Sequence, residues 1–183
     1  MALTDKAHEL ISTHFETVSV PPSLAVDATC GNGHDTLFLA KLGFEKVIGF
    51  DIQQKAITAT NLKLKKAHIE NIKLVHAGHE NIGSYTDQKI DCIMFNLGYL
   101  PSANKDITTK ATTTLSALKF CLTALSKGGL ISLMCYPGHP AGLEENNAIK
   151  KWLINLDDCW DVSTHQASSP KPTAPILYLL RKR

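Results

Sequence analysis

Residues 26–36 read VDATCGNGHDT, and they join an apolar strand to a helix through a loop with two glycines. A second apolar run, residues 47–50, ends at Asp51, about 20 residues after Gly31. A strand, a Gly-x-Gly loop, a helix and a second strand that ends in a carboxylate are typical of nucleoside-binding crevices. In such crevices the carboxylate accepts hydrogen bonds from ribose hydroxyls. The segment therefore predicts an α/β fold that binds a ligand containing adenosine.

Charge in this loop separates two kinds of adenosine ligand. A dinucleotide brings a pyrophosphate, and its fingerprint has a third glycine where this chain has Thr36. Asp35 at the start of the helix and Asp27 at the mouth of the loop both disfavour a phosphate there. The loop thus favours S-adenosylmethionine (SAM), which carries an ammonium and a sulfonium, over NAD. A second interpretation stays open, in which the glycines only turn the chain and Asp35 only caps the helix.

The expected cofactor contacts come from the tips that follow the first three strands. His79 and Glu80 follow the third strand and could contact the adenine or shape its pocket. We expect no metal, because His76 and His79 lack a third ligand. The candidate cofactor-binding residues are Asp27, Gly31, Asn32, Gly33, Asp51, Gln53, His79 and Glu80.

Length and composition predict one domain, residues 1–183, with an N-terminal helix inside residues 1–20 packed on it. The chain is 44% hydrophobic and 20% charged, as in ordinary globular proteins. No apolar run approaches the roughly 20 residues of a membrane helix, and the first residues lack a signal-peptide pattern. The five cysteines form no Cys-x-x-Cys pair, which favours free thiols. These features predict a cytoplasmic protein without membrane contact.

Apolar runs alternate with helical patterns along the whole chain. Seven strands, mostly separated by helices and ending in two strands joined by a proline-rich turn, predict the Rossmann-like fold of class I methyltransferases. That fold has a seven-stranded, mostly parallel sheet with an antiparallel last strand and helices on both faces. The expected strands are 24–28, 46–51, 72–76, 90–95, 130–135, 159–165 and 176–180, and the expected helices include 35–42, 53–67, one over 111–125 ended by Gly128-Gly129, and one striped over 149–156.

Asn96 is the first candidate catalytic residue, because it ends the fourth strand and precedes Tyr99 by three residues. This arrangement is similar to the Asn-Pro-Pro-Tyr motif of amine-directed methyltransferases, with residues 97–98 in place of the two prolines. The Asn96 oxygen could accept a hydrogen bond from a substrate amine and point its lone pair at the methyl group. Such orientation is worth up to about 7–11 kcal/mol. Tyr99 could stack on a base; alternatively, Asn96 only caps a turn.

His139 is the second candidate, in the segment Tyr136–Pro140 that follows the fifth strand. Because an unperturbed histidine titrates near neutrality, it could accept the proton released on methyl transfer. It could equally well make a structural hydrogen bond. Cys30 is expected to be a small apolar filler, because no base is adjacent to it.

Several segments together resemble a family of small bacterial methyltransferases long labelled rRNA methylases. These segments are 27–36, Gly78–Glu80, 95–101 and 136–144, and the resemblance spans essentially the whole chain. Members of the family methylate the amino group of 5-aminomethyl-2-thiouridine at the tRNA wobble position, so the resemblance implies that reaction here. It also implies that a tRNA anticodon stem-loop is the partner, held by the loops and by lysine clusters of one chain or of a homodimer.

Three other functions stay open on the sequence alone. One is methylation of rRNA or of a small-molecule amine. Another is a non-enzymatic module that binds an adenosine ligand, and the last is a dinucleotide oxidoreductase. An RNA substrate predicts binding that weakens steeply with salt, whereas a small metabolite predicts little salt dependence.

Overall fold

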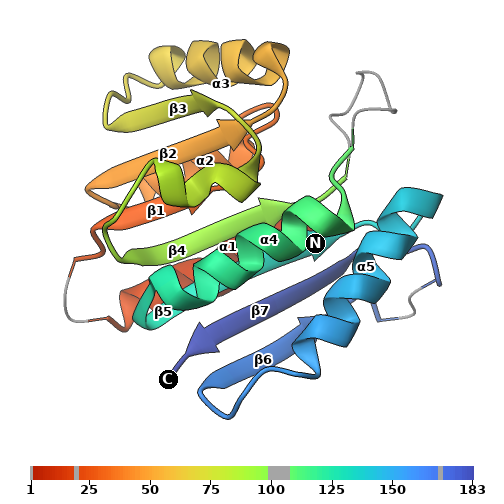
Figure 1. The fold of residues 1–183 in the computed structure, drawn as a ribbon. Coiled ribbons are helices and arrows are strands. Elements are labelled where there is room, and N and C mark those ends of the chain that lie inside the picture. Colours follow the sequence, from red (N-terminus) through yellow and green to blue (C-terminus); the bar gives the residue numbers. More distant parts are fainter. Residues whose placement is uncertain (1, 19–20, 99–107, 169–170) are drawn as a thin grey trace.

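The computed structural model describes residues 2–18, 21–98, 108–168 and 171–183, which form one sheet with helices on both faces (Figure 1). The strands are β1 (Leu24–Asp27), β2 (Lys46–Asp51), β3 (Ile72–His76), β4 (Ile90–Asn96), β5 (Leu125–Cys135), β6 (Trp160–His165) and β7 (Ile176–Lys182). The helices are α1 (Leu3–Glu16), α2 (His34–Lys41), α3 (Gln54–Lys66), the 3₁₀ helix η1 (His79–Ser84), α4 (Ala111–Ala124) and α5 (Pro140–Leu153).

The seven strands lie in the order β3-β2-β1-β4-β5-β7-β6. Neighbouring strands are parallel, except that β7 runs antiparallel to both β5 and β6. The predicted sheet is therefore confirmed, including its antiparallel last strand. From β1 the chain builds outward through β2 and β3, then returns to place β4 on the other side of β1. Strand order reverses between β1 and β4, and open α/β sheets bind their ligands at such a point.

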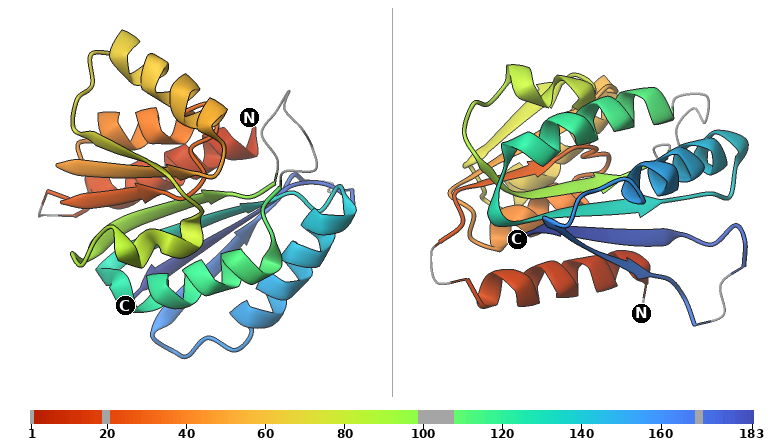
Figure 2. Two further views of the ribbon diagram at one scale, coloured as in Figure 1. Left: turned by 45° about the horizontal axis from the view of Figure 1, so that its top comes forward. Right: turned by 60° about the horizontal axis from the view of Figure 1, so that its bottom comes forward.

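Two apolar layers cover the sheet. One face packs against η1, α4 and α5, and the other packs against α1 and α2, which Figure 2 shows on opposite sides of the strands. In β1 the alternation of side chains places Val26 in the first layer and Ala25 in the second. Because both layers are covered, the central strands are apolar throughout, as parallel strands are when helices lie on both faces.

The end of α4 differs from the prediction. We expected Gly128-Gly129 to end this helix, with a strand beginning at residue 130. Instead α4 ends at Ala124, and β5 begins at Leu125 directly after it. The register of β5 against β4 shifts irregularly after Leu125, and Gly128 in this stretch has a φ of +77°. Gly128 therefore accommodates the irregularity in the strand, because glycine adopts a positive φ without strain.

Two further elements were not apparent from the apolar pattern. The helix α5 begins at Pro140, well before the apolar stripe that starts at residue 149. Proline at the first position is a helix-start signal, because its missing N–H would have no partner there in any case. The 3₁₀ helix η1 turns the chain after β3 and buries His79 against Phe95 of β4.

Candidate active site

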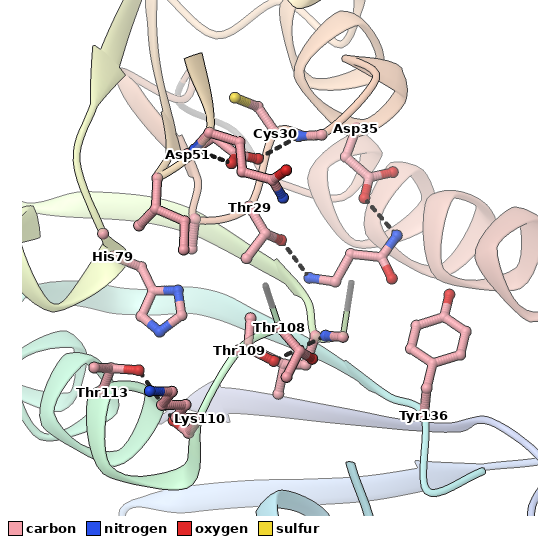
Figure 3. A pocket seen from close by; sticks show the side chains of 18 of the residues that line it. Thr29, Cys30, Asp35, Asp51, His79, Thr108, Thr109, Lys110, Thr113 and Tyr136 are labelled. Carbon is pink, nitrogen blue, oxygen red and sulfur yellow. Dashed lines mark hydrogen bonds between the residues drawn. The ribbon is translucent and has the colours of Figure 1, made fainter. Parts of the chain in front are cut away.

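A cavity of about 720 Å³ opens at the carboxyl ends of the central strands, at the point where strand order reverses. Its volume lies within the range of sites that hold ligands of nucleoside size. Side chains from the loops after β1, β2, β3, β4 and β5 line it, and Figure 3 shows them converging. Eight of the residues singled out in the sequence line this cavity: Gly31, Asn32, Asp51, Gln53, His79, Glu80, Asn96 and His139.

Two of the singled-out residues that the structure describes are not among those that line the cavity. Asp27 and Gly33 are described by the structure and lie behind the loop surface, as shown below. Tyr99 lies outside the described residues.

Asp51 closes the glycine loop from the end of β2. Its Oδ2 accepts a hydrogen bond of 2.9 Å from the Gly31 amide, and its Oδ1 accepts one of 2.8 Å from the Gln53 amide. Burial raises the pKa of this carboxyl, and the two amide hydrogen bonds oppose that rise. A carboxylate can accept about four hydrogen bonds, so acceptor capacity remains on the side facing the cavity. This capacity suits the two hydroxyls of a ribose.

Gly33 lets α3 approach the loop closely. Its φ is +73°, and a Cβ at this position would lie 2.8 Å from Thr60 Oγ1 and 3.0 Å from Thr60 Cα. The Thr60 hydroxyl in turn donates to the Gly31 carbonyl at 3.1 Å. The second glycine of the motif therefore shapes the loop and does not itself face the ligand.

Gly33→Ala should lower the affinity for SAM by at least tenfold and the free energy of unfolding by more than 1 kcal/mol. A matched control is Gly43→Ala, because Gly43 also has a positive φ (+97°) but nothing within 4 Å of its added Cβ. The control isolates backbone strain from the clash with Thr60. Isothermal titration with SAM and urea unfolding measure the two quantities. Equal affinities for the two variants would contradict this account of Gly33.

The sequence predicted that Asp27 contacts the cofactor, but the structure does not place it in the cavity lining. The residue is fully buried under the loop, where its Oδ2 accepts from Thr36 Oγ1 at 2.6 Å and its Oδ1 from the Thr29 amide at 3.1 Å. Burial, helped by the negative charge of Asp35, raises the pKa of Asp27 to about 7. Because it is turned away from the cavity, its role is to hold the loop from beneath. The same hydrogen bond explains why Thr36 stands where a dinucleotide site has glycine.

The raised pKa of Asp27 predicts a pH-dependent stability. Between the unfolded pKa near 3.8 and the folded pKa near 7, the folded chain holds a proton that the unfolded chain has lost. The contribution of Asp27 to stability is therefore fully present below pH 4 and is lost as the pH rises through 7. Asp27→Asn removes this titration, so the stability of the variant relative to wild type should increase steadily from pH 4 to pH 7. Urea unfolding of both proteins across that range measures the difference, and a flat difference would contradict the assignment.

Asn96 is held at both of its ends. Its backbone N–H donates to Thr29 Oγ1 at 2.8 Å, and its side-chain Nδ2 donates to Asp35 Oδ2 through a longer contact of 3.4 Å (Figure 3). An ionised carboxylate only accepts hydrogen bonds, so Asp35 requires the NH2 group of Asn96 to face it. The Asn96 oxygen is then directed away from Asp35. Asp35 itself lines the cavity, so it does more than start the helix α2.

Tyr136 completes this side of the cavity and was not a candidate on sequence grounds. Its hydroxyl interacts with Asn96, and Figure 3 shows this hydroxyl pointing toward the side of the cavity where Asp35 lies. Burial raises the pKa of Tyr136, and the negative charge of Asp35 raises it further. A neutral phenol, an amide and a carboxylate thus surround one point at the end of β4. This is a polar, acidic environment suited to a cationic or amine group.

A chain of hydrogen bonds fixes the opposite side of the cavity. Buried Glu145 on α5 accepts from Thr114 Oγ1 and from Thr109 Oγ1, each at 2.6 Å. Thr114 Oγ1 also lies 3.2 Å from Nε2 of His79. Thr109 Oγ1 accepts from the Gly98 amide at 2.8 Å. Glu145 therefore joins the wall beneath η1 to the start of the loop after β4.

The three residues that extend this network from His79 were missed by the sequence analysis. Glu145 comes from α5, Thr114 from α4 and Thr109 from the segment before α4, and no local pattern joins them. Burial raises the pKa of Glu145 and lowers that of His79. A neutral His79 against the cavity wall fits an uncharged base better than a phosphate.

His139 is placed at the N-cap of α5. Its Nδ1 accepts a hydrogen bond of 3.1 Å from the Gly142 amide, and the residue also lines the cavity. Because Nδ1 is engaged in this cap, the geometry favours the structural interpretation of His139 over the proton acceptor. The cap also explains Gly142, since its Cβ would meet the Tyr136 carbonyl and the His139 ring.

Thr108 and Cys30 complete the lining. The buried hydroxyl of Thr108 has no hydrogen-bond partner among the described residues, so it is available to a bound ligand. Burial raises the pKa of the Cys30 thiol far above neutrality, which leaves it protonated and unsuited to act as a nucleophile. All five cysteines are free thiols, four of them buried.

Among the residues that the structure describes, no group of three or more His, Cys, Asp or Glu side chains is arranged to hold a metal ion. None of the helices seen there combines the length and apolar character needed to cross a bilayer.

A seven-stranded sheet of this order, with an acidic nucleoside crevice at its switch point, defines a Rossmann-like class I methyltransferase. Residues 47–181 match the family model described as "Putative rRNA methylase". The chain is 37% identical to the chloroplastic tRNA (mnm(5)s(2)U34)-methyltransferase of Arabidopsis thaliana over 97% of its own length and 70% of that protein's. The chain belongs to this rRNA methylase family and is a methyltransferase.

Solved structures agree over nearly the whole chain. A putative rRNA methylase from Clostridium thermocellum superposes with a TM-score of 0.91 at 37% identity, covering 98% of this chain and 97% of that one. A putative methyltransferase from Streptococcus mutans, solved in complex with SAH, superposes with a TM-score of 0.85 at 36% identity, covering 96% and 97%. These likenesses confirm the fold and the family that the sequence predicted.

Proposed function

We propose that this protein transfers a methyl group from SAM to the amino group of 5-aminomethyl-2-thiouridine at the wobble position of tRNA. The Arabidopsis relative is named for the methylated form of that uridine at position 34, mnm(5)s(2)U34, and the Streptococcus mutans structure holds SAH, the form that SAM takes after giving up its methyl group. The observation that carries the proposal is the orientation of Asn96. Its NH2 group faces Asp35, which leaves its oxygen to accept from an amine.

The cavity fits SAM on three grounds. Asp51 at the end of β2 keeps acceptor capacity for the ribose hydroxyls, and Thr108 offers a buried hydroxyl without a partner among the described residues. Asp35 gives the lining a negative charge that suits an ammonium and a sulfonium but repels a pyrophosphate. We assign the adenine side to His79 and Glu80 and the loop side to Gly31 and its neighbours. Bound SAM supplies a methyl group activated by the positive sulfur.

The chain's own residues then have to orient the acceptor. A primary amine attacks through its nitrogen lone pair, in line with the carbon–sulfur bond that breaks. Hydrogen bonds from the amine N–H groups to Asn96 Oδ1 would fix that lone pair in direction, which is catalysis by orientation. Lys110, exposed at the start of α4, also lines the cavity and offers a positive charge to a substrate phosphate.

Mass spectrometry of nucleosides tests the proposal directly. The purified protein is incubated with SAM and with tRNA that carries the 5-aminomethyl group, and the digest should then contain 5-methylaminomethyl-2-thiouridine. Matched reactions contain the same tRNA without the wobble modification, ribosomal RNA, or free amines. A methyl group found on ribosomal RNA, on a free amine, or on no acceptor at all would refute the assignment. Activity on tRNA should also fall steeply as salt is raised.

A further inference from the structure

The N-terminal helix α1 places a histidine against the active site from the outside. His8 Nε2 lies 2.7 Å from Asp35 Oδ1, and both side chains are largely buried. The His8 ring also stacks on Phe38, with 3.9 Å between centroids and an interplanar angle of 4°. Two independent contacts therefore fix this imidazole, one with a carboxylate that lines the cavity and one with the aromatic ring beneath it.

Asp35 transmits this contact into the cavity. One of its oxygens is held by His8, and the other faces Asn96 Nδ2. Without His8, the Asp35 carboxylate could rotate about its own side-chain bonds. Asn96 would then lose the Asp35 oxygen that accepts from its NH2 group and so fixes the orientation of its amide. The orientation of the Asn96 oxygen thus depends on a residue that does not line the cavity.

We propose that His8 is a positioning residue for methyl transfer, acting through Asp35 to hold the Asn96 oxygen toward the acceptor amine. The inference rests on the proposed function, because it assigns a purpose to that amide. It also makes α1 part of the active site, although the helix precedes the first strand of the sheet.

The helix α1 has anchors other than His8. The helix buries Ala7 and Ile11 in the core, and His14 near its end contacts the Gly128 carbonyl at 2.8 Å. Because these contacts do not involve position 8, we expect α1 to stay on the sheet in His8 variants. The short contact between His8 and Asp35 therefore acts on a carboxylate that lines the cavity.

Steady-state kinetics with amine-bearing tRNA test the proposal. His8→Leu keeps bulk against Phe38 but removes the donor, and it should lower kcat by at least tenfold while KM for tRNA and the affinity for SAM stay within about twofold. His8→Gln keeps an N–H near the place of Nε2 and should recover most of kcat. His14→Leu, on the same helix, is the matched control and should keep wild-type kinetics. A wild-type kcat in His8→Leu, or equal losses in the Leu and Gln variants, would overturn the proposal.

A double-mutant cycle distinguishes action through Asp35 from a separate role. If His8 acts only through Asp35, adding His8→Leu to Asp35→Asn should cause almost no further loss of kcat. Losses that multiply in the double variant would refute the coupling.

Nitrogen NMR of labelled histidine gives a readout that needs no acceptor. The His8 Nε2 signal should report a protonated nitrogen in wild type and should shift in Asp35→Asn. An unchanged signal would overturn the pairing itself. By contrast, a wild-type enzyme that forms the pair but leaves the wobble amine unmethylated would refute only the proposed function.

Discussion

Asn96→Ala should reduce methyl transfer by at least a thousandfold while the affinity for SAM stays within a few-fold of wild type. The alanine removes the side-chain amide at the end of β4, which Asp35 holds in orientation and which is placed to accept from the amine. Loss of orientation alone can cost several kcal/mol, and each 1.4 kcal/mol is a factor of ten in rate. Single-turnover assays measure the rate, and isothermal titration measures the affinity for SAM.

A matched control for this variant is Asn155→Ala. Asn155 is exposed beyond α5 and donates to the Lys151 carbonyl, so its removal tests the loss of an asparagine far from the cavity. We expect wild-type rates for it. If Asn96→Ala lost SAM binding in step with its activity, Asn96 would instead be a cofactor or folding residue, and the proposed function would lose its main support.

The sheet and its binding edge could be predicted because their signals are local. Each apolar strand is followed by a polar or glycine-rich tip, and parallel strands bring those tips to one edge. The position of Asp51 follows from the same rule, since a residue at the end of β2 must reach the loop after β1. The antiparallel β7 follows from the absence of a helix between β6 and β7.

The different positions of Asp27, buried beneath the loop, and Asp35, in the cavity lining, could not be predicted from the sequence. Both carboxylates flank the same loop, and nothing in their spacing shows that Asp27 turns under the loop toward Thr36 while Asp35 turns into the cavity. That choice depends on which carboxylate finds partners in the layers above and below. His8 supplies the partner for Asp35, from a helix 27 residues away in the chain.

The network around Glu145 was hidden for a similar reason. Glu145 lies in a helix that the sequence pattern showed only from residue 149 onward, and its partners Thr109 and Thr114 are 36 and 31 residues away. Threonine and glutamate at these positions look like ordinary surface residues. Their burial follows only when α4 and α5 pack on the same face of the sheet.

Asp51→Ala should have the opposite signature to Asn96→Ala, weakening SAM binding by at least a hundredfold before it affects chemistry. Two hydrogen bonds from ribose hydroxyls to a charged carboxylate would be lost, each worth about 1.5–3 kcal/mol. The variant would also lose the hydrogen bonds that hold the loop after β1 against the end of β2, because the Gly31 and Gln53 amides both donate to Asp51. At saturating SAM, kcat should return to within about tenfold of wild type.

A comparison with Asp161→Ala separates loss of this contact from loss of any carboxylate. Asp161 lies on β6 and pairs with Arg181 and Arg183 at the far edge of the sheet, so its removal should leave the affinity for SAM unchanged. Isothermal titration of both variants with SAM and SAH gives the affinities. A variant that lacked Asp51 but bound SAM as tightly as wild type would place the ribose elsewhere. The crevice at the end of β2 would then be a structural feature of the fold, and the case for an adenosine ligand there would fail.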